Sequence, residues 1–261
     1  MLRPRIIPCL LVKEEGLVKT VKFDKPKYVG DPINAVKIFN EKEVDELIVL
    51  DIGATSQRRA PDYKMIQHLA AECRMPLCYG GGVSTPEQAK KIIGLGVEKI
   101  AISTAAVNQP DLIRAVADEV GSQSVVVVLD VKKKMIGSRY EVWTGNGKNS
   151  TGRSPVELAQ MAQEMGAGEI VINSIDNDGV MKGYDTTLVE KVNEAISIPL
   201  TVIGGAGSLA DIEALVQRFG VIGASAGSLF VFKGAYKAVL INYPASPEKD
   251  ALIRSAMNSR R

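Results

Sequence analysis

The chain has 261 residues, 46% of them hydrophobic and 24% charged, which are ordinary values for a globular protein. Its formal net charge of +2 comes from 32 basic and 30 acidic residues, so composition gives no electrostatic case for nucleic-acid binding. The three cysteines have no metal-ligand spacing, which indicates a reducing cytoplasm, and the single histidine, His68, excludes multi-histidine metal sites. We expect a cytoplasmic protein with no membrane span, no metal and no cofactor.

Apolar strand-like runs alternate with amphipathic helical patterns along the whole chain. The predicted strands are Arg5–Leu11, Glu46–Asp51, Leu77–Tyr79, Lys99–Ser103, Val125–Asp130, Glu169–Asn173, Leu200–Ile203 and Val221–Ser225. One helix is predicted to begin at Ser84 as its N-cap, with Pro86 in the first turn, and another at Ser208. Eight strand–helix units predict an α/β fold, a single (β/α)8 (TIM) barrel, with a doubly wound sheet as the alternative.

The second half of the sequence repeats the first at an offset of about 120 residues. The segment "DELIVLD" (45–51) corresponds to "GEIVINS" (168–174), and "MPLCYGGGVST" (75–85) corresponds to "IPLTVIGGAGS" (198–208). The same offset pairs Leu11 with Asp130. This predicts an internal two-fold (β/α)4 repeat, with halves at about 1–122 and 123–243, in one domain that spans 1–261.

Two long segments follow the equivalent first and fifth strands. Val12–Gly30 is predicted to be a mobile loop, and Lys132–Thr151 a small hairpin. Segments of this length in a compact domain are usually functional or disordered. Both are expected on the face formed by the C-terminal ends of the strands, where barrels of this kind carry their chemistry.

Glycine-rich segments follow the third and seventh strands, and a predicted helix follows each of them. Gly80–Gly82 and Gly204–Gly207 would let backbone N–H groups approach a phosphate near a helix N-terminus. The segments "ISTAAV" (102–107) and "AGSLF" (226–230) add hydroxyl groups beside small residues. The duplicated pattern predicts two phosphate sites for a ligand phosphorylated at both ends. The alternative is that the glycines only relieve crowding at the strand ends.

Three carboxylates follow predicted strands. Asp130 comes directly after the apolar run Val125–Leu129, so we expect burial to raise its pKa and to suit it for general acid or base catalysis. Asp51 and Asp176 follow the second and sixth strands. For Asp176 and its neighbour Asp178 the alternative is a purely turn-forming role.

Four charged residues stand at the opposite ends of the strands. Arg5, Glu46, Lys99 and Glu169 each open a strand, and strand alternation places Arg5 on the same face as Leu11. If these faces point inward, two cations and two anions close the floor of the barrel. A static plug is the alternative to a functional role, because four buried charges must all pair.

These segments together resemble the cyclase subunit of imidazole glycerol phosphate synthase, and within that family most closely its paralogues associated with lipopolysaccharide and other surface glycans. The likeness spans Met1 to about Tyr243 and is carried by "RIIPCLLVKEEGLVKTVKF", "GDPINAVKIFNEKEVDELIVLDI", "GGGVSTPEQAKKIIGLGVEKIAISTAAV", "GSQSVVVVLDV", "GAGEIVINSIDNDGVMKGYD" and "GGAGS". The resemblance implies a barrel that binds a glutaminase subunit at its N-terminal face as a heterodimer and passes ammonia to the opposite face. There, the cyclase converts a doubly phosphorylated substrate.

The resemblance also implies roles for individual residues. Of the family's two catalytic aspartates, Asp130 matches the second, whereas Leu11 occupies the position of the first. Lys19 matches a lysine that supports catalysis. The ammonia gate matches Arg5, Glu46, Lys99 and Glu169, and phosphate-contacting positions match Gly82, Thr104, Gly179, Gly205, Gly227 and Ser228. Departures from the family pattern near the active site are Ser103, Asn173 and Ile203.

The leading hypothesis is therefore an ammonia-channelling, synthase-type subunit of a glutamine amidotransferase system. A third protein, an amidotransferase acting on an N-acetylated sugar, would form the acetamidino group. One alternative is a true cyclase of histidine biosynthesis in which Asp51 or Lys19 compensates for Leu11. Another is a non-catalytic scaffold that binds a phosphorylated small molecule.

Overall fold

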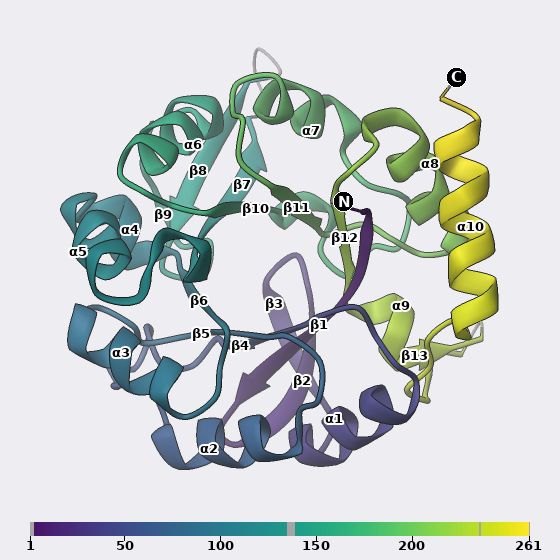
Figure 1. Ribbon diagram of the computed structural model, residues 1–261, viewed down its shortest axis with the longest axis horizontal. Helices are drawn as coiled ribbons and strands as arrows, with labels where there is room; N and C mark the ends of the chain where they lie inside the picture. Colours follow the sequence, from purple (N-terminus) through teal and green to yellow (C-terminus); the bar gives the residue numbers. More distant parts are fainter. Residues whose placement is uncertain (1–2, 135–138, 235, 261) are drawn as a thin grey trace.

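The computed structural model describes residues 3–134, 139–234 and 236–260. Its barrel strands are β1 (Arg5–Lys13), β4 (Leu47–Asp51), β5 (Leu77–Gly80), β6 (Lys99–Ile102), β7 (Val125–Lys133), β10 (Glu169–Ser174), β11 (Leu200–Ile203) and β12 (Gly223–Ala226). Within the described residues these strands are parallel and follow the order β10-β11-β12-β1-β4-β5-β6-β7, and β7 pairs back to β10 (Figure 1). The predicted (β/α)8 barrel is confirmed, and closure excludes the doubly wound sheet. The division into halves near residue 122 stays a prediction.

Helices surround the barrel in Figure 1. The longer ones are α1 (Pro32–Glu41), α2 (Tyr63–Glu72), α3 (Pro86–Gly94), α5 (Asp111–Val120), α6 (Pro155–Glu164), α7 (Thr186–Asn193), α8 (Leu209–Phe219) and α10 (Ser246–Asn258). Shorter ones are α4 (Thr104–Asn108), α9 (Ser228–Val231), η1 (Ser122–Ser124) and η2 (Ile175–Asn177). Helix α10, which the sequence patterns did not predict, packs beside α8. None of the helices in the described ranges is long and apolar enough to cross a membrane.

The N-termini of α3 and α8 are closed by their own side chains. Helix α3 has Thr85 as its N-cap, one residue later than the predicted Ser84, and a capping box with Gln88. Helix α8 begins after the predicted N-cap, Ser208, which forms a capping box with Asp211. These boxes satisfy first-turn N–H groups that would otherwise be free to bind an anion.

The barrel wall separates two apolar regions, because successive strand residues point to opposite faces. On β1, Ile6 and Leu10 pack outward against the helices, whereas Ile7 and Cys9 point into the lumen. The lumen is filled by Ile7, Cys9, Ile48, Cys78, Ala101, Val126, Val128, Val171 and Ile203, with Leu11 and Leu50 partly buried against them. The centre of the barrel is therefore a packed apolar core.

Two hairpins rise from equivalent strands. Val12–Gly30, expected as a mobile loop, instead contains β2 (Gly16–Val21) and β3 (Asp24–Gly30), and β2 pairs antiparallel with β1. That prediction was wrong because Leu17 and Val18 are buried against the barrel. The hairpin expected in Lys132–Thr151 is present as β7 paired with β8 (Tyr140–Thr144), followed by β9 (Asn149–Ser150), although 135–138 lie outside the described residues.

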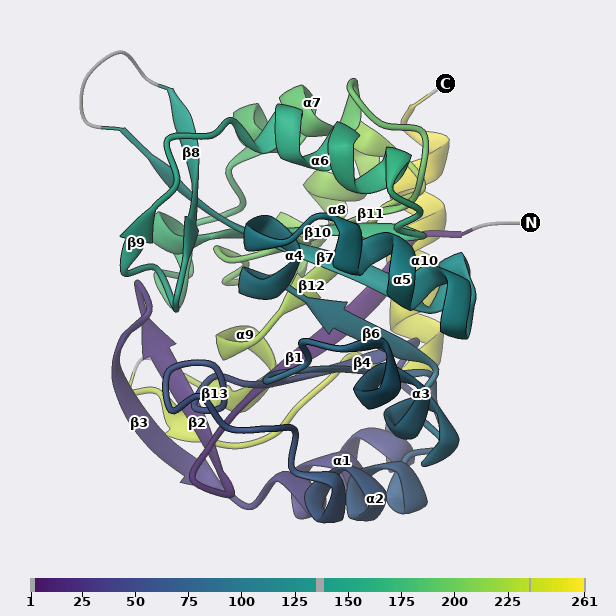
Figure 2. The same cartoon turned by 90° about the vertical axis from the view of Figure 1, so that its left-hand side faces the viewer.

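Figure 2 shows β2–β3 and β8–β9 at the same end of the barrel, away from the N- and C-termini. A further two-stranded unit, β13 (Phe232–Lys233) with β14 (Ala238–Val239), follows α9. The hairpins therefore build up the walls of the face on which the parallel strands end.

Candidate functional site

A cavity of about 590 Å³ lies at the C-terminal ends of the barrel strands. It is lined by the nine residues that match the family's catalytic and phosphate-contacting positions: Leu11, Lys19, Gly82, Thr104, Asp130, Gly179, Gly205, Gly227 and Ser228. They come from both halves of the chain, and barrel closure brings them around one space. The four residues of the predicted gate are absent from this lining and lie at the opposite end of the strands.

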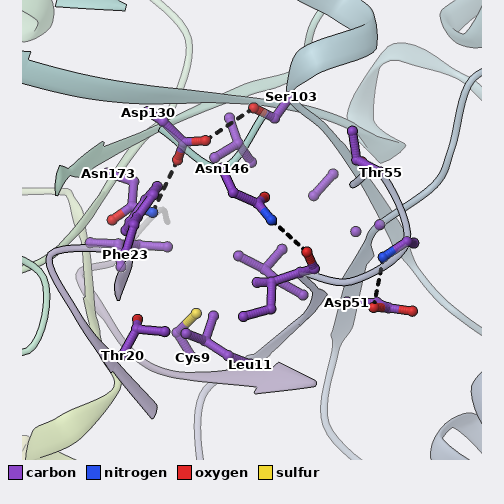
Figure 3. Close-up of a pocket in the computed structure, with 18 of the residues that line it drawn as sticks. Cys9, Leu11, Thr20, Phe23, Asp51, Thr55, Ser103, Asp130, Asn146 and Asn173 are labelled. Atoms are coloured by element: carbon purple, nitrogen blue, oxygen red, sulfur yellow. Dashed lines mark hydrogen bonds between the residues drawn. The ribbon is translucent and has the colours of Figure 1, made fainter. Parts of the chain in front are cut away.

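Asp130 is buried at the end of β7. Its Oδ1 accepts a hydrogen bond from Asn173 Nδ2 at 3.1 Å, and its Oδ2 accepts one from Ser103 Oγ at 3.4 Å (Figure 3). Burial raises the pKa of Asp130 to about 7, and the two hydrogen bonds offset only part of this increase. The carboxyl can therefore hold or release a proton near neutral pH, as a general acid or base requires.

Leu11 lies on the side of the cavity opposite Asp130 in Figure 3. Its side chain is partly exposed to the cavity and packs against the apolar lumen. Since the repeat pairs Leu11 with Asp130, the cavity has a carboxyl on one side and an apolar group on the equivalent side. The Leu11 side chain itself cannot transfer a proton.

Asp51 also lines the cavity, but both oxygens of its carboxylate already have partners within the protein. Oδ1 accepts from the backbone N–H groups of Gly53 at 2.9 Å and Ala54 at 3.1 Å, and Oδ2 pairs with Arg59 Nη2 at 3.1 Å. These bonds shape the loop after β4. Both carboxylate oxygens of Asp51 are therefore held by its own loop.

Lys19 reaches the cavity from β2 and is buried. Its Nζ donates to the carbonyl of Cys9 at 2.6 Å, and burial lowers the pKa of the ammonium group. A Cβ at Gly227 would approach this ammonium group to 2.5 Å, so a side chain there would displace the end of Lys19. The structure thus places Lys19 against β1 and the start of α9.

Asp178, for which a purely turn-forming role was the alternative, lines the cavity. Its Oδ2 accepts from Thr20 Oγ1 at 2.7 Å and from the Phe23 backbone N–H at 3.0 Å, which ties the β2–β3 hairpin to the segment after β10. A Cβ at Gly179 would collide with the Thr20 carbonyl, so glycine permits this approach. Asp176 has a different role, because it accepts from the Lys133 backbone N–H at 2.8 Å.

The residues of the two predicted phosphate sites line the cavity, but the helices near them differ in their capping. The helices that follow the two glycine segments, α3 and α8, are capped by their own side chains. The short helices α4 and α9 have no side-chain cap, and their first residues, Thr104 and Ser228, line the cavity. At Gly81 the crowding alternative holds, because a Cβ there would collide with the backbone of Asp51. The uncapped N-termini of α4 and α9 therefore face the cavity together with the glycine segments, and phosphate binding there stays a prediction.

The turn between β8 and β9 extends across the cavity. Gly145 N–H donates to Thr104 Oγ1 at 3.0 Å, and Asn146 Nδ2 donates to the carbonyl of Ile52 at 2.5 Å. Figure 3 shows Asn146 projecting between the walls toward that carbonyl. Asn146 was not among the residues predicted from the sequence, although its position in "TGNG" is a turn signal.

The four charged residues at the N-terminal ends of the strands form a closed ring. Lys99 Nζ contacts Glu46 Oε1 at 2.7 Å and Glu169 Oε2 at 2.8 Å. Arg5 Nη2 contacts Glu169 Oε1 at 2.8 Å, and its Nη1 is hydrogen-bonded to Glu46. Each ion thus contacts both counter-ions. A further member, missed from the sequence, is Thr201, whose Oγ1 donates to Glu169 at 2.6 Å.

Burial raises the pKa of Glu169, but the adjacent charges of Arg5 and Lys99 outweigh burial and leave this pKa below its usual value. The Glu169 carboxylate therefore stays ionised, and the ring holds two positive and two negative charges. No cluster of three or more potential metal ligands occurs in the stretches 3–134, 139–234 and 236–260.

The fold and site define a (β/α)8 barrel with a ligand-sized cavity at the C-terminal ends of its strands. The profile of the family described as "Histidine biosynthesis protein" matches residues 5–237, so the chain belongs to this family. A relative from Leptospira interrogans, named putative imidazole glycerol phosphate synthase subunit HisF, is 56% identical over 252 residues, which cover 97% of this chain and 99% of the relative.

Two further relatives show the range of similarity. A putative imidazole glycerol phosphate synthase subunit hisF2 of Pseudomonas aeruginosa is 55% identical over 244 residues, covering 94% of this chain and 97% of the relative. An imidazole glycerol phosphate synthase subunit HisF of Streptomyces griseus is 40% identical over 228 residues, covering 87% and 90%. The resemblance identified from the sequence motifs is thus confirmed at the level of the family.

Proposed function

We propose that this chain is the ammonia-transferring subunit of a glutamine amidotransferase system and that a glutaminase binds at the N-terminal face of its barrel. The main support for this proposal is the order of the charged ring, the apolar lumen and the cavity along the barrel axis. A charged ring closes one end of an apolar lumen, and the other end opens into a cavity with Asp130 on one side and Leu11 on the other.

The apolar lumen favours passage of a neutral molecule over passage of an ion. Ammonia in neutral water is mostly ammonium, and moving an unpaired charge into an apolar interior is strongly unfavourable. A lumen lined by Ile7, Val128, Val171 and their neighbours therefore favours the unprotonated, nucleophilic form. The ring of Arg5, Glu46, Lys99 and Glu169 would act as the gate, since its ions would have to separate for ammonia to enter.

The cavity is less suited to the cyclase reaction. One positioned acid or base contributes ~10²–10⁴-fold to a rate, and leucine at position 11 removes one of the family's two. Neither proposed substitute is free, because Asp51 is bonded to its own loop and Lys19 to the Cys9 carbonyl. Transfer of ammonia needs neither group.

In this proposal the ammonia serves a third protein, an amidotransferase that forms an acetamidino group on an N-acetylated sugar for lipopolysaccharide or O-antigen synthesis. The support for this acceptor is the resemblance to surface-glycan paralogues. A phosphorylated small molecule would occupy the cavity near Gly82, Thr104, Gly179, Gly205, Gly227 and Ser228.

A second candidate function is the imidazole glycerol phosphate synthase cyclase reaction. One support is the near-neutral pKa of Asp130, which suits a catalytic acid or base. The other is that the relatives are named as subunits of imidazole glycerol phosphate synthase. The two candidates differ in whether the chain alone turns over the doubly phosphorylated substrate.

The test combines binding and turnover. The purified chain is incubated with the doubly phosphorylated cyclase substrate and an ammonium salt, and its tagged form is used to capture a glutaminase from the same organism. We expect glutaminase capture without cyclase turnover. Turnover at ~1–10³ per second would instead establish the cyclase. Phosphate-ligand binding with no glutaminase capture would identify a scaffold and contradict ammonia transfer.

A further inference from the structure

A buried polar atom without a hydrogen-bond partner can bind a small polar ligand. Among the described residues, three buried side-chain atoms have no hydrogen-bond partner: Tyr79 OH, Asn173 Oδ1 and Ser225 Oγ. Tyr79 belongs to the apolar layer between the strands and the helices. The other two face the inside of the barrel, as the strand register shows.

Ser225 pairs with Ile7 across β12 and β1, and Asn173 pairs with Ile203 across β10 and β11. Register partners in a parallel sheet point to the same face, and both Ile7 and Ile203 belong to the lumen. Ser225 and Asn173 therefore point into the lumen from two strands that flank β11.

The two residues also lie at successive depths between the ring and the cavity. Arg5 of the ring pairs with Gly223, and Ser225 stands two residues further along the same strand. Asn173 lies beside Asp130 and lines the cavity (Figure 3), whereas Ser225 is absent from the cavity lining and fully buried. The Ser225 hydroxyl is thus nearer the ring, and the Asn173 amide oxygen is at the cavity floor.

Neither atom can easily find a partner within the protein. The Asn173 amide is oriented by its Nδ2, which donates to Asp130, so its Oδ1 is left as an acceptor. Apolar side chains such as Ile7, Val171 and Ile203 line the lumen, and the Thr201 hydroxyl donates to Glu169. An unsatisfied buried hydroxyl or amide oxygen is energetically unfavourable.

We propose that Ser225 Oγ and Asn173 Oδ1 are two successive binding positions for one small, neutral, hydrogen-bonding molecule: ammonia during transfer and water at rest. The ammonia part rests on the function proposed above, whereas the binding positions themselves do not. The Ser225 hydroxyl can both accept from and donate to ammonia, and an alcohol is too weak an acid to protonate it. The Asn173 oxygen can accept an N–H of ammonia next to Asp130.

The binding positions are tested first by crystal structures of the full chain, with water as the only probe. We expect a density peak at about 2.7–3.2 Å from Ser225 Oγ in the unmodified protein, and another near Asn173 Oδ1. Ser225→Thr and Ser225→Val have the same shape and differ in the hydroxyl, so the first peak should persist in the Thr variant and vanish in the Val variant. A Ser225 hydroxyl bonded to a protein atom, with no peak beside it, would overturn the proposal.

The transport role is tested in the complex with glutaminase and the acceptor protein. Ser225→Val should lower glutamine-driven product formation by about five-fold relative to the Thr variant, the effect expected for one lost hydrogen bond. The reaction driven by added ammonium salt should change much less, because external ammonia enters the open cavity above Ser225. An equal loss in both reactions would show a structural effect and contradict the transport role.

Tyr79→Phe is the matched control, because it removes the same kind of unpartnered buried hydroxyl outside the lumen. It should leave the ratio of glutamine-driven to ammonium-driven product unchanged. If no glutaminase binds the chain, the proposed function fails while the crystal structures still decide the binding positions. If the complex makes product from glutamine but neither density peak is present, the proposed binding positions are wrong and the proposed function stands.

Discussion

Asn173 donates its amide hydrogen to Asp130 at 3.1 Å, and so binds the one cavity carboxyl whose pKa burial raises to about 7. Two strands that are distant in sequence, β7 and β10, pair directly at this point, with Asn173 opposite Asp130 in the register. The contact therefore depends on closure of the barrel. It also makes the protonation of Asp130 a property of the folded state.

The first prediction concerns the pH dependence of stability. The pKa of Asp130 rises from 3.8 to about 7 on folding, so the folded chain binds more protons than the unfolded chain between these values. The contribution to stability is complete below pH 3.8 and is lost as pH rises through 7, by about 4 kcal/mol. Asp130→Asn should therefore unfold in more urea than the parent at pH 8, with a smaller difference at pH 5. An unchanged pH profile would show that Asp130 is ionised throughout.

The second prediction concerns the position equivalent to Asp130 in the repeat. Leu11→Asp places a carboxyl on the opposite side of the cavity, where it can transfer a proton. We expect ammonium-dependent turnover of the doubly phosphorylated cyclase substrate to rise by ~10²-fold or more above the parent. Leu11→Asn is the control, because it adds polarity without an acid and should leave turnover at the parent level. Equal turnover in the Asp and Asn variants would contradict the prediction.

The third prediction concerns the charged ring. Glu169→Gln leaves Arg5 and Lys99 sharing one carboxylate, and breaking a buried ion pair in this way typically costs about 3–5 kcal/mol. The free energy of unfolding, measured in urea at pH 7, should fall by this amount. Glu157→Gln is the matched control, since its pair with Arg153 is exposed and should contribute under ~1 kcal/mol. Similar losses in both variants would show that the ring is not a buried network.

The fourth prediction concerns Arg58 at the edge of the cavity. Its N–H bonds to the Thr55 carbonyl and the next N–H to that of Ala54, which is a Schellman turn, and Arg58 has a φ of 52° where glycine is favoured. Arg58→Gly should stabilise the protein by about 0.5–1 kcal/mol and raise the Tm by roughly 1–3 °C. A lower Tm would contradict this account.

Glu43→Gly provides the comparison, because Glu43 has a φ of 51° at a similar turn and does not line the cavity. Both variants should gain stability. If the Arg58 guanidinium also attracts an anionic ligand, only Arg58→Gly should weaken binding of inorganic phosphate, measured by calorimetric titration. Equal phosphate affinity in the two variants would exclude that contribution of Arg58.

Much of the fold could be predicted from local patterns. The strand Leu200–Ile203 was predicted with the observed bounds, because an isolated apolar run is a reliable strand signal. Strand β7 was predicted to end at Asp130 but continues to Lys133, since antiparallel pairing with β8 extends it. Helix α10 was missed because only part of one face is buried, with Lys249 and Ala256 facing the barrel.

The candidate site was predictable in part. Alternation along strands and the internal repeat identified the cavity residues Leu11 and Asp130, whose functional roles stay predictions. Thr201 and Asn146 were missed because their partners lie far away in sequence, at Glu169 and Ile52. The contact of Asp178 with Thr20 was also missed, since it requires the β2–β3 hairpin to fold against the segment after β10.

The sequence by itself determined which residues share a face: Arg5, Ile7, Cys9 and Leu11 follow the two-residue period of a strand. It also determined the repeat that pairs the two halves. Only the tertiary structure decided that this face is the inner one, that each ion of the ring contacts both counter-ions, and that Ser225 lacks a partner. The physical reason is closure, because β1 meets β12 and β7 meets β10 at distances and levels that no local pattern encodes.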